Sequence, residues 1–444
     1  MKKICIVWAL LLALLLSGCG EKSAPVPVPA PEGDYSISLA QESVDLLAGQ
    51  EDAYIEIAEF TRNGEFADPA YLRYTTSDSD VVTVENGNLK GVGAGTASVV
   101  VSCGNASDEL TVRVWERAES ADLSESTVRT YGRTYGQNGG IAADNVNSGI
   151  GFSFYGTQCR IQIYNSAGTT QYLRYYLDGD REGRRVPISR AGLHTYSFAA
   201  DLEPGIHSIR VMKATEQNLW GTSFSLLFTG VETGEGCELL YRLPEEERLK
   251  IDFYGDSITA GQGNLAESSA EGISVANSDG TQTYAAFTAE ALGSESDFIG
   301  YGGITVKAPK YYGTDITMYS IWHWYSTLNR TEYPVDPDTD FVVINLGTND
   351  AGVTGYGTQQ FAQDYLSLLN DMSAAYPRAK FVLCYGMMGT TYFIEQGIRQ
   401  TIEEFSGEAY YCRLPSNLLG AGSHPTVEGH RAAAKTLTEF LKTL

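Results

Sequence analysis

The sequence is poor in charged residues, and in basic residues above all. Only 19% of its 444 residues are charged, and 31 Lys and Arg stand against 55 Asp and Glu, which gives a formal net charge of −24 at pH 7. A nucleic-acid-binding protein needs a basic face, so this balance argues against that class of partner. No Cys-x-x-Cys or Cys/His spacing suggests zinc, and we expect neither a metal nor another cofactor.

Long apolar runs are also scarce. The run at residues 4–16 follows Lys2 and Lys3 and is shorter than the roughly 20 residues that a transmembrane helix needs. A basic start, an apolar stretch and small residues before a cleavage point are the parts of a secretory signal. The run ends in Leu16-Ser-Gly-Cys, which resembles a bacterial lipobox.

That resemblance implies that Cys19 is lipidated once the signal is removed. We therefore expect residues 1–19 to be a lipoprotein signal peptide and residues 20–33 to be a proline-rich tether. The mature protein would be exported and held on the surface of a bacterial cell by its lipid alone. An ordinary signal peptide with an incidental cysteine is the alternative.

Three regions follow the tether, and the pattern of apolar residues in the last region differs from that in the first two. Residues 34–116 and 118–245 consist of short alternating apolar and polar runs separated by turn residues, which predicts a β-sandwich and then a jelly-roll or second sandwich. In residues 248–444, short continuous apolar runs alternate with amphipathic segments. This pattern predicts an α/β domain whose parallel sheet is covered on both faces. The strands are expected at 251–254, 297–300, 341–346, 381–385 and 410–414, and helices at 359–375, 391–405 and 426–444.

In such a sheet, functional groups gather beyond the carboxyl ends of the strands. Ser257 follows the first strand on a tight turn, where its hydroxyl is a candidate nucleophile, although a helix N-cap serine is the common alternative. The segment Gly300–Gly303 ends the second strand and Asn349 follows the third. These residues either donate N–H groups to a developing anion or serve only the local turns.

A serine nucleophile needs a base, and histidine has the suitable pKa. His424 lies in a loop just before the last predicted helix, and Pro425 disfavours a helical conformation there. We prefer His424 over the other histidines, which lie in the β-rich region, an aromatic segment and the final helix (His194 and His207, His323, and His430).

These residues carry a recognisable pattern. Gly255-Asp-Ser-Ile, Gly303, Asn345-Leu-Gly-Thr-Asn-Asp and His424-Pro-Thr-Val-Glu-Gly-His resemble the four blocks of the SGNH (GDSL-like) hydrolases. The resemblance implies a three-layer, flavodoxin-like α/β fold in which Ser257 is the nucleophile and His424 the base. It also implies an oxyanion hole made by the N–H groups of Ser257 and Gly303 and the side chain of Asn349.

The preceding regions add two more resemblances. Gly132-Arg-Thr, Phe152-Ser-Phe-Tyr-Gly-Thr and Met212-Lys-Ala-Thr-Glu-Gln resemble the jelly-roll of carbohydrate esterase family 2. That family joins a jelly-roll to an SGNH domain and removes O-acetyl groups from plant polysaccharides. Ser77-Asp-Ser-Asp-Val-Val-Thr-Val and Leu89-Lys-Gly-Val resemble bacterial immunoglobulin-like domains of group 2.

One position departs from the SGNH pattern. Most members have Asp three residues before the histidine, where this chain has Ala421. Some family 2 esterases also lack this carboxylate and are thought to work as Ser-His dyads in which a backbone carbonyl holds the ring, so the resemblance implies a dyad of Ser257 and His424.

The expected substrate is an acetylated polysaccharide or oligosaccharide of the xylan or mannan type. Trp322, Trp324 and Tyr325 cluster in a long insertion and could stack on sugar rings, or pack in the core or a lid. Two other functions remain open: a lipolytic SGNH esterase, and a non-catalytic carbohydrate-binding lipoprotein, which the two β-domains and Ala421 would also suit.

Overall fold

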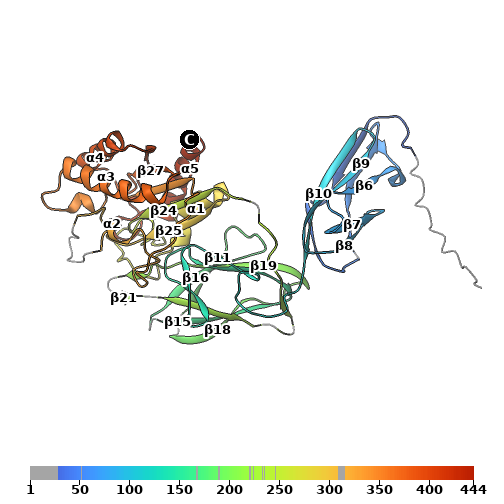
Figure 1. Cartoon of the computed structure of the whole chain (residues 1–444), viewed down its shortest axis with the longest axis horizontal. Coiled ribbons are helices and arrows are strands. Elements are labelled where there is room, and N and C mark those ends of the chain that lie inside the picture. Colours follow the sequence, from blue (N-terminus) through green and yellow to red (C-terminus); the bar gives the residue numbers. More distant parts are fainter. Residues whose placement is uncertain are drawn as a thin grey trace, which may run out of the picture.

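The computed structural model describes residues 29–444, except 52, 167–168, 189–190, 220–221, 224, 233, 235, 246 and 309–315. The expected signal peptide, Cys19 and most of the tether lie outside the described residues. Figure 1 shows a first β-domain (blue) apart from the rest, and a second β-domain (green) directly against an α/β domain (yellow to red). In the described part of the chain, no helix is both long and apolar enough to cross a membrane.

The first domain is made of small sheets around one core. In β9, Ala97, Val99, Val101 and Cys103 are buried at every second position, as expected of a strand with one face on a core. The sheet orders are β1-β4-β5, β2-β10-β9-β6 and β3-β8-β7. The strands are β1 (Tyr35–Leu39), β2 (Ser43–Leu47), β3 (Ala53–Tyr54), β4 (Ile57–Arg62), β5 (Glu65–Phe66), β6 (Arg73–Thr76), β7 (Val82–Glu85), β8 (Asn88–Gly91), β9 (Gly95–Cys103) and β10 (Ala106–Trp115).

The second domain is built from two antiparallel sheets that share a core. Ile150 and Phe154 of one sheet pack in the same cluster as Ile161, Ile163 and Phe228 of the other. The sheet orders are β11-β14-β19-β16-β17, with β23 paired to β14, and β12-β13-β22-β15-β18. The strands are β11 (Val128–Tyr131), β12 (Thr134–Gln137), β13 (Gly140–Ala143), β14 (Gly149–Gly156), β15 (Cys159–Asn165), β16 (Gln171–Leu177), β17 (Arg184–Ile188), β18 (Gly192–Ala199), β19 (Gly205–Lys213), β20 (Asn218–Leu219), β21 (Thr222–Ser223), β22 (Leu226–Val231) and β23 (Cys237–Leu239).

The third domain has the parallel sheet that its apolar runs predict. Its strand order is β25-β24-β26-β27-β28, and all neighbouring strands are parallel. The helix α1 was not predicted, because its buried residues are mostly small or polar and give a weak apolar stripe. The elements are β24 (Lys250–Gly255), α1 (Tyr284–Leu292), β25 (Glu295–Gly300), α2 (Met318–Ile321), β26 (Phe341–Asn345), α3 (Thr358–Ala375), β27 (Lys380–Tyr385), α4 (Tyr392–Glu404), β28 (Ala409–Arg413) and α5 (Val427–Leu441).

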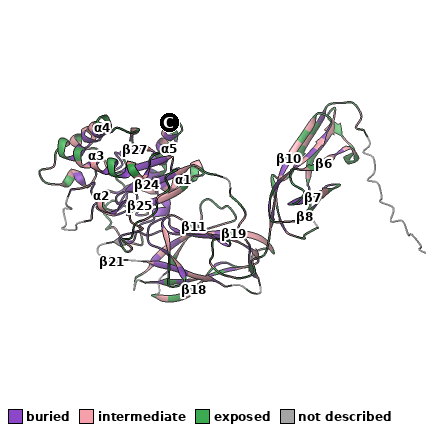
Figure 2. Cartoon of the chain, viewed as in Figure 1, coloured by how far each residue is buried: buried purple, intermediate pink, exposed green. Residues whose placement is uncertain are grey.

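Each face of this sheet is covered by helices. Ile251 and Phe253 of β24 pack with α1 and α5, whereas Tyr254 belongs to the cluster formed with α3 and α4. Because successive side chains of a strand point to opposite faces, the continuous apolar runs supply both interfaces. Figure 2 shows these strands as the most buried part of the domain (purple).

The junction of the second and third domains is anchored by a buried arginine. Arg133 lies in the turn between β11 and β12, and its side chain is 0% exposed. Its guanidinium donates to the carbonyls of Trp322 (2.7 Å) and Trp324 (2.6 Å) and to the hydroxyl of Tyr254 (2.6 Å). It also faces Asp297 at 3.5 Å. Cutting these contacts would leave a buried carboxylate without its cation, so Arg133 ties the two domains into one unit.

We therefore expect Arg133→Ala to destabilise both domains together. Removing one partner of a buried ion pair costs about 3–5 kcal/mol, and the thermal midpoint should fall by several degrees in calorimetry. The control is Arg117→Ala, whose ion pair with Glu238 is about half exposed and should matter little. Equal midpoints for the two variants would show that Arg133 does not hold the junction.

Candidate active site

Ser257 lies on the turn that follows β24. The turn is tight: a Cβ atom on Gly255 would lie 2.1 Å from the Thr259 hydroxyl oxygen, so glycine is required there. The Ser257 carbonyl accepts the N–H of Gln262 at 3.0 Å, which closes the turn. The serine is only 6% exposed, at the carboxyl edge of the sheet where the sequence places a nucleophile.

The structure brings His424 to this serine. His424 Nε2 lies 2.8 Å from Ser257 Oγ. The histidine follows a short 3-10 turn, Ala421–Ser423, and has an extended backbone (φ −75°, ψ 161°) directly before Pro425, in agreement with a loop position. The imidazole is therefore presented to the serine from a hydrogen-bonded turn just before α5, in which the Gly420 N–H donates to the His424 carbonyl at 2.8 Å.

The other ring nitrogen fixes the tautomer. His424 Nδ1 lies 3.1 Å from the carbonyl oxygen of Ala421, which can only accept, so Nδ1 carries the proton. Nε2 is then free to accept the Ser257 hydroxyl proton. Burial lowers the pKa of His424, against the opposing effect of the backbone carbonyl, and this keeps the ring neutral near pH 7.

Ala421 itself is fully buried against Gly263. The Ala421 N–H donates to the Gly263 carbonyl at 3.0 Å, and a Cβ atom added to Gly263 would lie 2.8 Å from that of Ala421. A backbone carbonyl thus takes the place at which most SGNH enzymes have a carboxylate, and the close packing holds that carbonyl in position.

The two further candidate oxyanion donors lie at the neighbouring strand ends. Gly303 follows β25 with a left-handed backbone (φ 70°), which favours glycine. The Asn349 amide donates to the Ile304 carbonyl at 2.8 Å and to Asp256 at 3.3 Å. The first bond orients the amide, whereas the second is long and an oxyanion beside Ser257 would compete with it.

Two buried acids near these loops were not singled out from the sequence, although they belong to the quoted motifs. Asp256 accepts the N–H of Ile258 at 2.9 Å, and Asp350 accepts that of Val306 at 3.1 Å. Burial raises the pKa of each carboxyl to about 7. Both acids tie strand-end loops together, which makes them supports of the site.

The aromatic residues expected to contact substrate are placed differently. Trp322 is buried in the core, and its indole N–H donates to Asp371 of α3 at 2.9 Å. The carbonyls of Trp322 and Trp324 bind Arg133, and the Tyr325 carbonyl accepts from Asn145 at 2.8 Å. Of the two alternatives that the sequence left open, sugar stacking and core packing, the structure therefore favours core packing for Trp322. The Trp324 ring lies beside Arg330 and His323, and the Tyr325 ring lies between Tyr135 of the second β-domain and Tyr333. None of these described contacts involves Ser257.

The remaining candidate histidines also serve other contacts. His323 lies between the rings of Trp322 and Trp324, at centroid distances of 5.4 and 5.9 Å. His430 is fully buried in α5, where its Nδ1 accepts the N–H of Tyr284 at 3.0 Å and burial lowers its pKa to about 3. Of these histidines, only His424 has a described contact with the serine.

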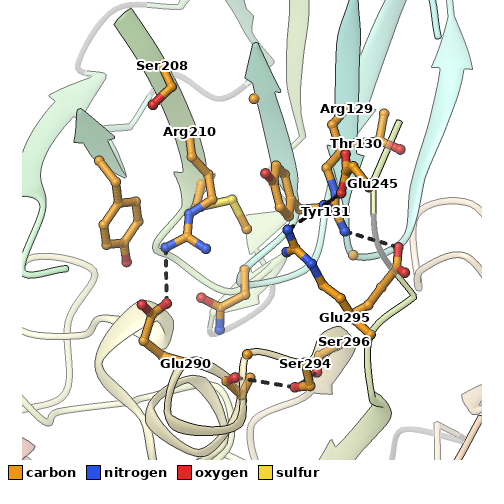
Figure 3. Close-up of a pocket in the computed structure, with 18 of the residues that line it drawn as sticks. Arg129, Thr130, Tyr131, Ser208, Arg210, Glu245, Glu290, Ser294, Glu295 and Ser296 are labelled. Atoms are coloured by element: carbon orange, nitrogen blue, oxygen red, sulfur yellow. Dashed lines mark hydrogen bonds and ion pairs between the residues drawn. The ribbon is translucent and has the colours of Figure 1, made fainter. Parts of the chain in front are cut away.

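A large cleft lies elsewhere, where the domains meet. It encloses about 1390 Å³, and Ser257 and His424 are not among its lining residues. Figure 3 shows Arg129 and Arg210 reaching from β-strands toward acidic partners, with Arg210 bound to Glu290 at 3.4 Å and Arg129 paired with Glu245. These arginines are engaged in ion pairs, and the cleft lacks the serine–histidine pair, so we place the chemistry at Ser257.

The arrangement at Ser257 suits acyl transfer. A serine hydroxyl, a neutral imidazole at hydrogen-bond distance and nearby N–H donors are the parts of a serine esterase site. Within the described residues, no three His, Cys, Asp or Glu side chains are grouped to hold a metal ion.

Two protein families match adjacent parts of the chain. Residues 130–242 match the N-terminal domain of carbohydrate esterase 2, and residues 253–432 match the GDSL-like lipase/acylhydrolase family. A curated relative, the cellulase/esterase CelE of Acetivibrio thermocellus, is 27% identical over 312 residues. The alignment covers 66% of this chain but only 36% of CelE, so the chain spans about a third of that relative.

Solved structures show the same fold. A family two carbohydrate esterase from Clostridium thermocellum, in complex with cellohexaose, has a TM-score of 0.63 at 24% identity, covering 71% of this chain and 98% of its own. An acetyl xylan esterase from the rumen bacterium Butyrivibrio proteoclasticus has a TM-score of 0.64 at 20% identity, covering 74% and 98%. The chain thus joins a region that matches the carbohydrate esterase 2 N-terminal domain to a region that matches the GDSL-like lipase/acylhydrolase family, and its fold is similar to that of solved family two carbohydrate esterases.

Proposed function

We propose that this protein is an esterase that removes acetyl groups from plant polysaccharides of the xylan or mannan type through a Ser257–His424 dyad. The observation that carries the proposal is the pair of contacts made by His424, to Ser257 Oγ at 2.8 Å and to the Ala421 carbonyl at 3.1 Å. The names of the similar proteins, an acetyl xylan esterase and an esterase bound to cellohexaose, support a polysaccharide substrate.

The first half-reaction forms an acetyl-enzyme. His424 Nε2 takes the hydroxyl proton of Ser257 as Oγ attacks the acetyl carbonyl carbon. The negative oxygen that develops is met by the N–H groups of Ser257 and Gly303 and by the Asn349 amide. The tetrahedral species then collapses, and His424 gives its proton to the departing sugar oxygen.

The second half-reaction releases acetate. His424 takes a proton from a water molecule, whose oxygen attacks the acetyl carbon, and Ser257 recovers its proton as the ester bond breaks. During both steps the imidazolium is stabilised by the Ala421 carbonyl, since its Nδ1–H already points at that oxygen.

We also propose that the protein is an exported lipoprotein anchored at Cys19, so that it meets polymers outside the cell. This rests on residues 1–19 of the sequence alone.

Ser257→Ala should abolish hydrolysis of 4-nitrophenyl acetate while leaving the thermal midpoint unchanged, because the variant loses only the nucleophilic oxygen. The wild type should also release acetate from acetylated xylan and glucomannan, and Ser257→Ala should not. An unchanged rate in the variant would refute the assignment of Ser257.

Two measurements distinguish an acetyl esterase from a lipolytic esterase and from a non-catalytic carbohydrate-binding protein. An acetyl esterase should prefer 4-nitrophenyl acetate to the octanoate, whereas a lipolytic enzyme should show the reverse order. Binding of polysaccharide without any acetate release would identify a carbohydrate-binding protein instead.

The activity should depend on pH through His424. Only the neutral imidazole accepts the serine proton, and burial lowers its pKa below 6.5. We therefore expect kcat/KM for 4-nitrophenyl acetate to rise with pH along a limb below 6.5 and to level off above it. A limb centred above pH 7 would contradict the neutral, buried state of His424.

Asp or Asn at position 421 should change the rate modestly, because the backbone carbonyl already orients the ring. The carboxylate of Ala421→Asp would favour the imidazolium, so its acid limb should move to higher pH, whereas Ala421→Asn should leave the limb nearly in place. If Ala421→Asp created activity in an otherwise inactive protein, the dyad proposal would fail.

A further inference from the structure

One carboxylate of the second β-domain contacts two loop segments beside the active site. Glu216 lies in the loop that follows β19 and is only 5% exposed. Its Oε1 accepts the side-chain amide of Gln262 at 2.5 Å, and its Oε2 accepts the backbone N–H of Gly302 at 3.1 Å. Both partners belong to the α/β domain.

The two partners of Glu216 lie in the turn that carries Ser257 and in the turn that carries Gly303. The Gln262 N–H donates to the Ser257 carbonyl at 3.0 Å, and Gly302 directly precedes Gly303, the candidate oxyanion donor. A Cβ atom on Gly302 would lie 2.2 Å from the Gln262 side-chain nitrogen, so the two segments are in close contact. Glu216 therefore ties the nucleophile turn to the oxyanion turn.

The loop that carries Glu216 is held on both sides. Thr215 donates its hydroxyl to Gln171 at 2.7 Å. On the other side, Gln217 donates to Asn145 at 2.7 Å and accepts from the Thr327 backbone at 2.8 Å. These bonds restrict the backbone around Glu216, so its carboxylate is placed before substrate arrives.

The buried charge has a nearby counterpart. Lys213 is fully buried at the end of β19 and donates its ammonium to the Thr215 carbonyl. Burial lowers the pKa of Lys213 to about 7, whereas Asp144 and Glu216 favour its charged form. The interaction is mutual, so the ammonium form of Lys213 lowers the cost of burying the Glu216 carboxylate.

We propose that Glu216 is a positioning residue that holds the Gly302–Gly303 turn so that the Gly303 N–H points at the oxyanion. The inference rests on the proposed function and extends it, because it makes the second β-domain part of the catalytic apparatus. Hydrogen bonds to a charged acceptor are stronger than those between neutral groups, which suits a carboxylate to this task.

The test compares Glu216→Ala and Glu216→Gln with the wild type, on the whole chain, with 4-nitrophenyl acetate. Glu216→Ala should lower kcat by about 10- to 100-fold with little change in KM. This loss is at most about as large as the loss caused by removing one oxyanion donor. Glu216→Gln keeps an oxygen acceptor and should recover part of kcat. Glu182→Ala is the matched control, since Glu182 also crosses between the domains, to Arg431 at 3.3 Å, but on the exposed surface. It should keep wild-type kcat.

The outcomes separate the possible roles. A residue needed only for domain docking would lower the thermal midpoint and leave kcat at 25 °C unchanged, which would overturn the proposal. If Glu216→Ala does not fold, Gln262→Ala removes one of the two contacts and should still lower kcat at unchanged KM; full activity there would also overturn it. If wild type and Ser257→Ala hydrolyse the ester equally, it is the proposed function that fails.

Discussion

The hydrogen bond between His424 and Ser257 joins groups that are 167 residues apart in the chain. Its geometry depends on the parallel sheet, which places the ends of all five strands along one edge. It depends equally on α5, because His424 stands just before this helix. The helix packs on α1, where His430 accepts the Tyr284 N–H at 3.0 Å. A buried histidine with no catalytic contact thus helps to position the one that reaches the serine.

The second β-domain contacts the α/β domain through an extensive buried junction. Their junction is lined with buried polar and charged groups, of which Arg133, Lys213 and Glu216 are the clearest. Such groups are costly to bury unless each meets a partner of matching geometry, so the junction is specific to one arrangement. A mobile appended module would leave these groups exposed to water, so the two domains are better described as one structural unit.

The elements of the α/β domain could be predicted because their apolar periodicity is strong. The helix α1 could not, since its buried positions include Ala285, Thr288 and Ala289 and leave little contrast between its faces. The prediction that Trp322 stacks on sugar rings failed for a different reason. An aromatic residue in a loop has the same appearance in the sequence whether its ring faces a ligand or the core, and only packing against α3 distinguishes them.

Residue types and order alone were enough to name the serine and the histidine before Pro425, which the structure places at hydrogen-bond distance. The roles of Gly303 and Asn349 as oxyanion donors stay predictions. The tertiary structure decided how these groups act together. It identified the Ala421 carbonyl as the backbone oxygen that faces the imidazole, and it showed that Glu216 of the second β-domain contacts Gly302. Both contacts depend on how the chain folds. Neither the position of a backbone oxygen nor the partner of a carboxylate in another domain can be identified from residue types.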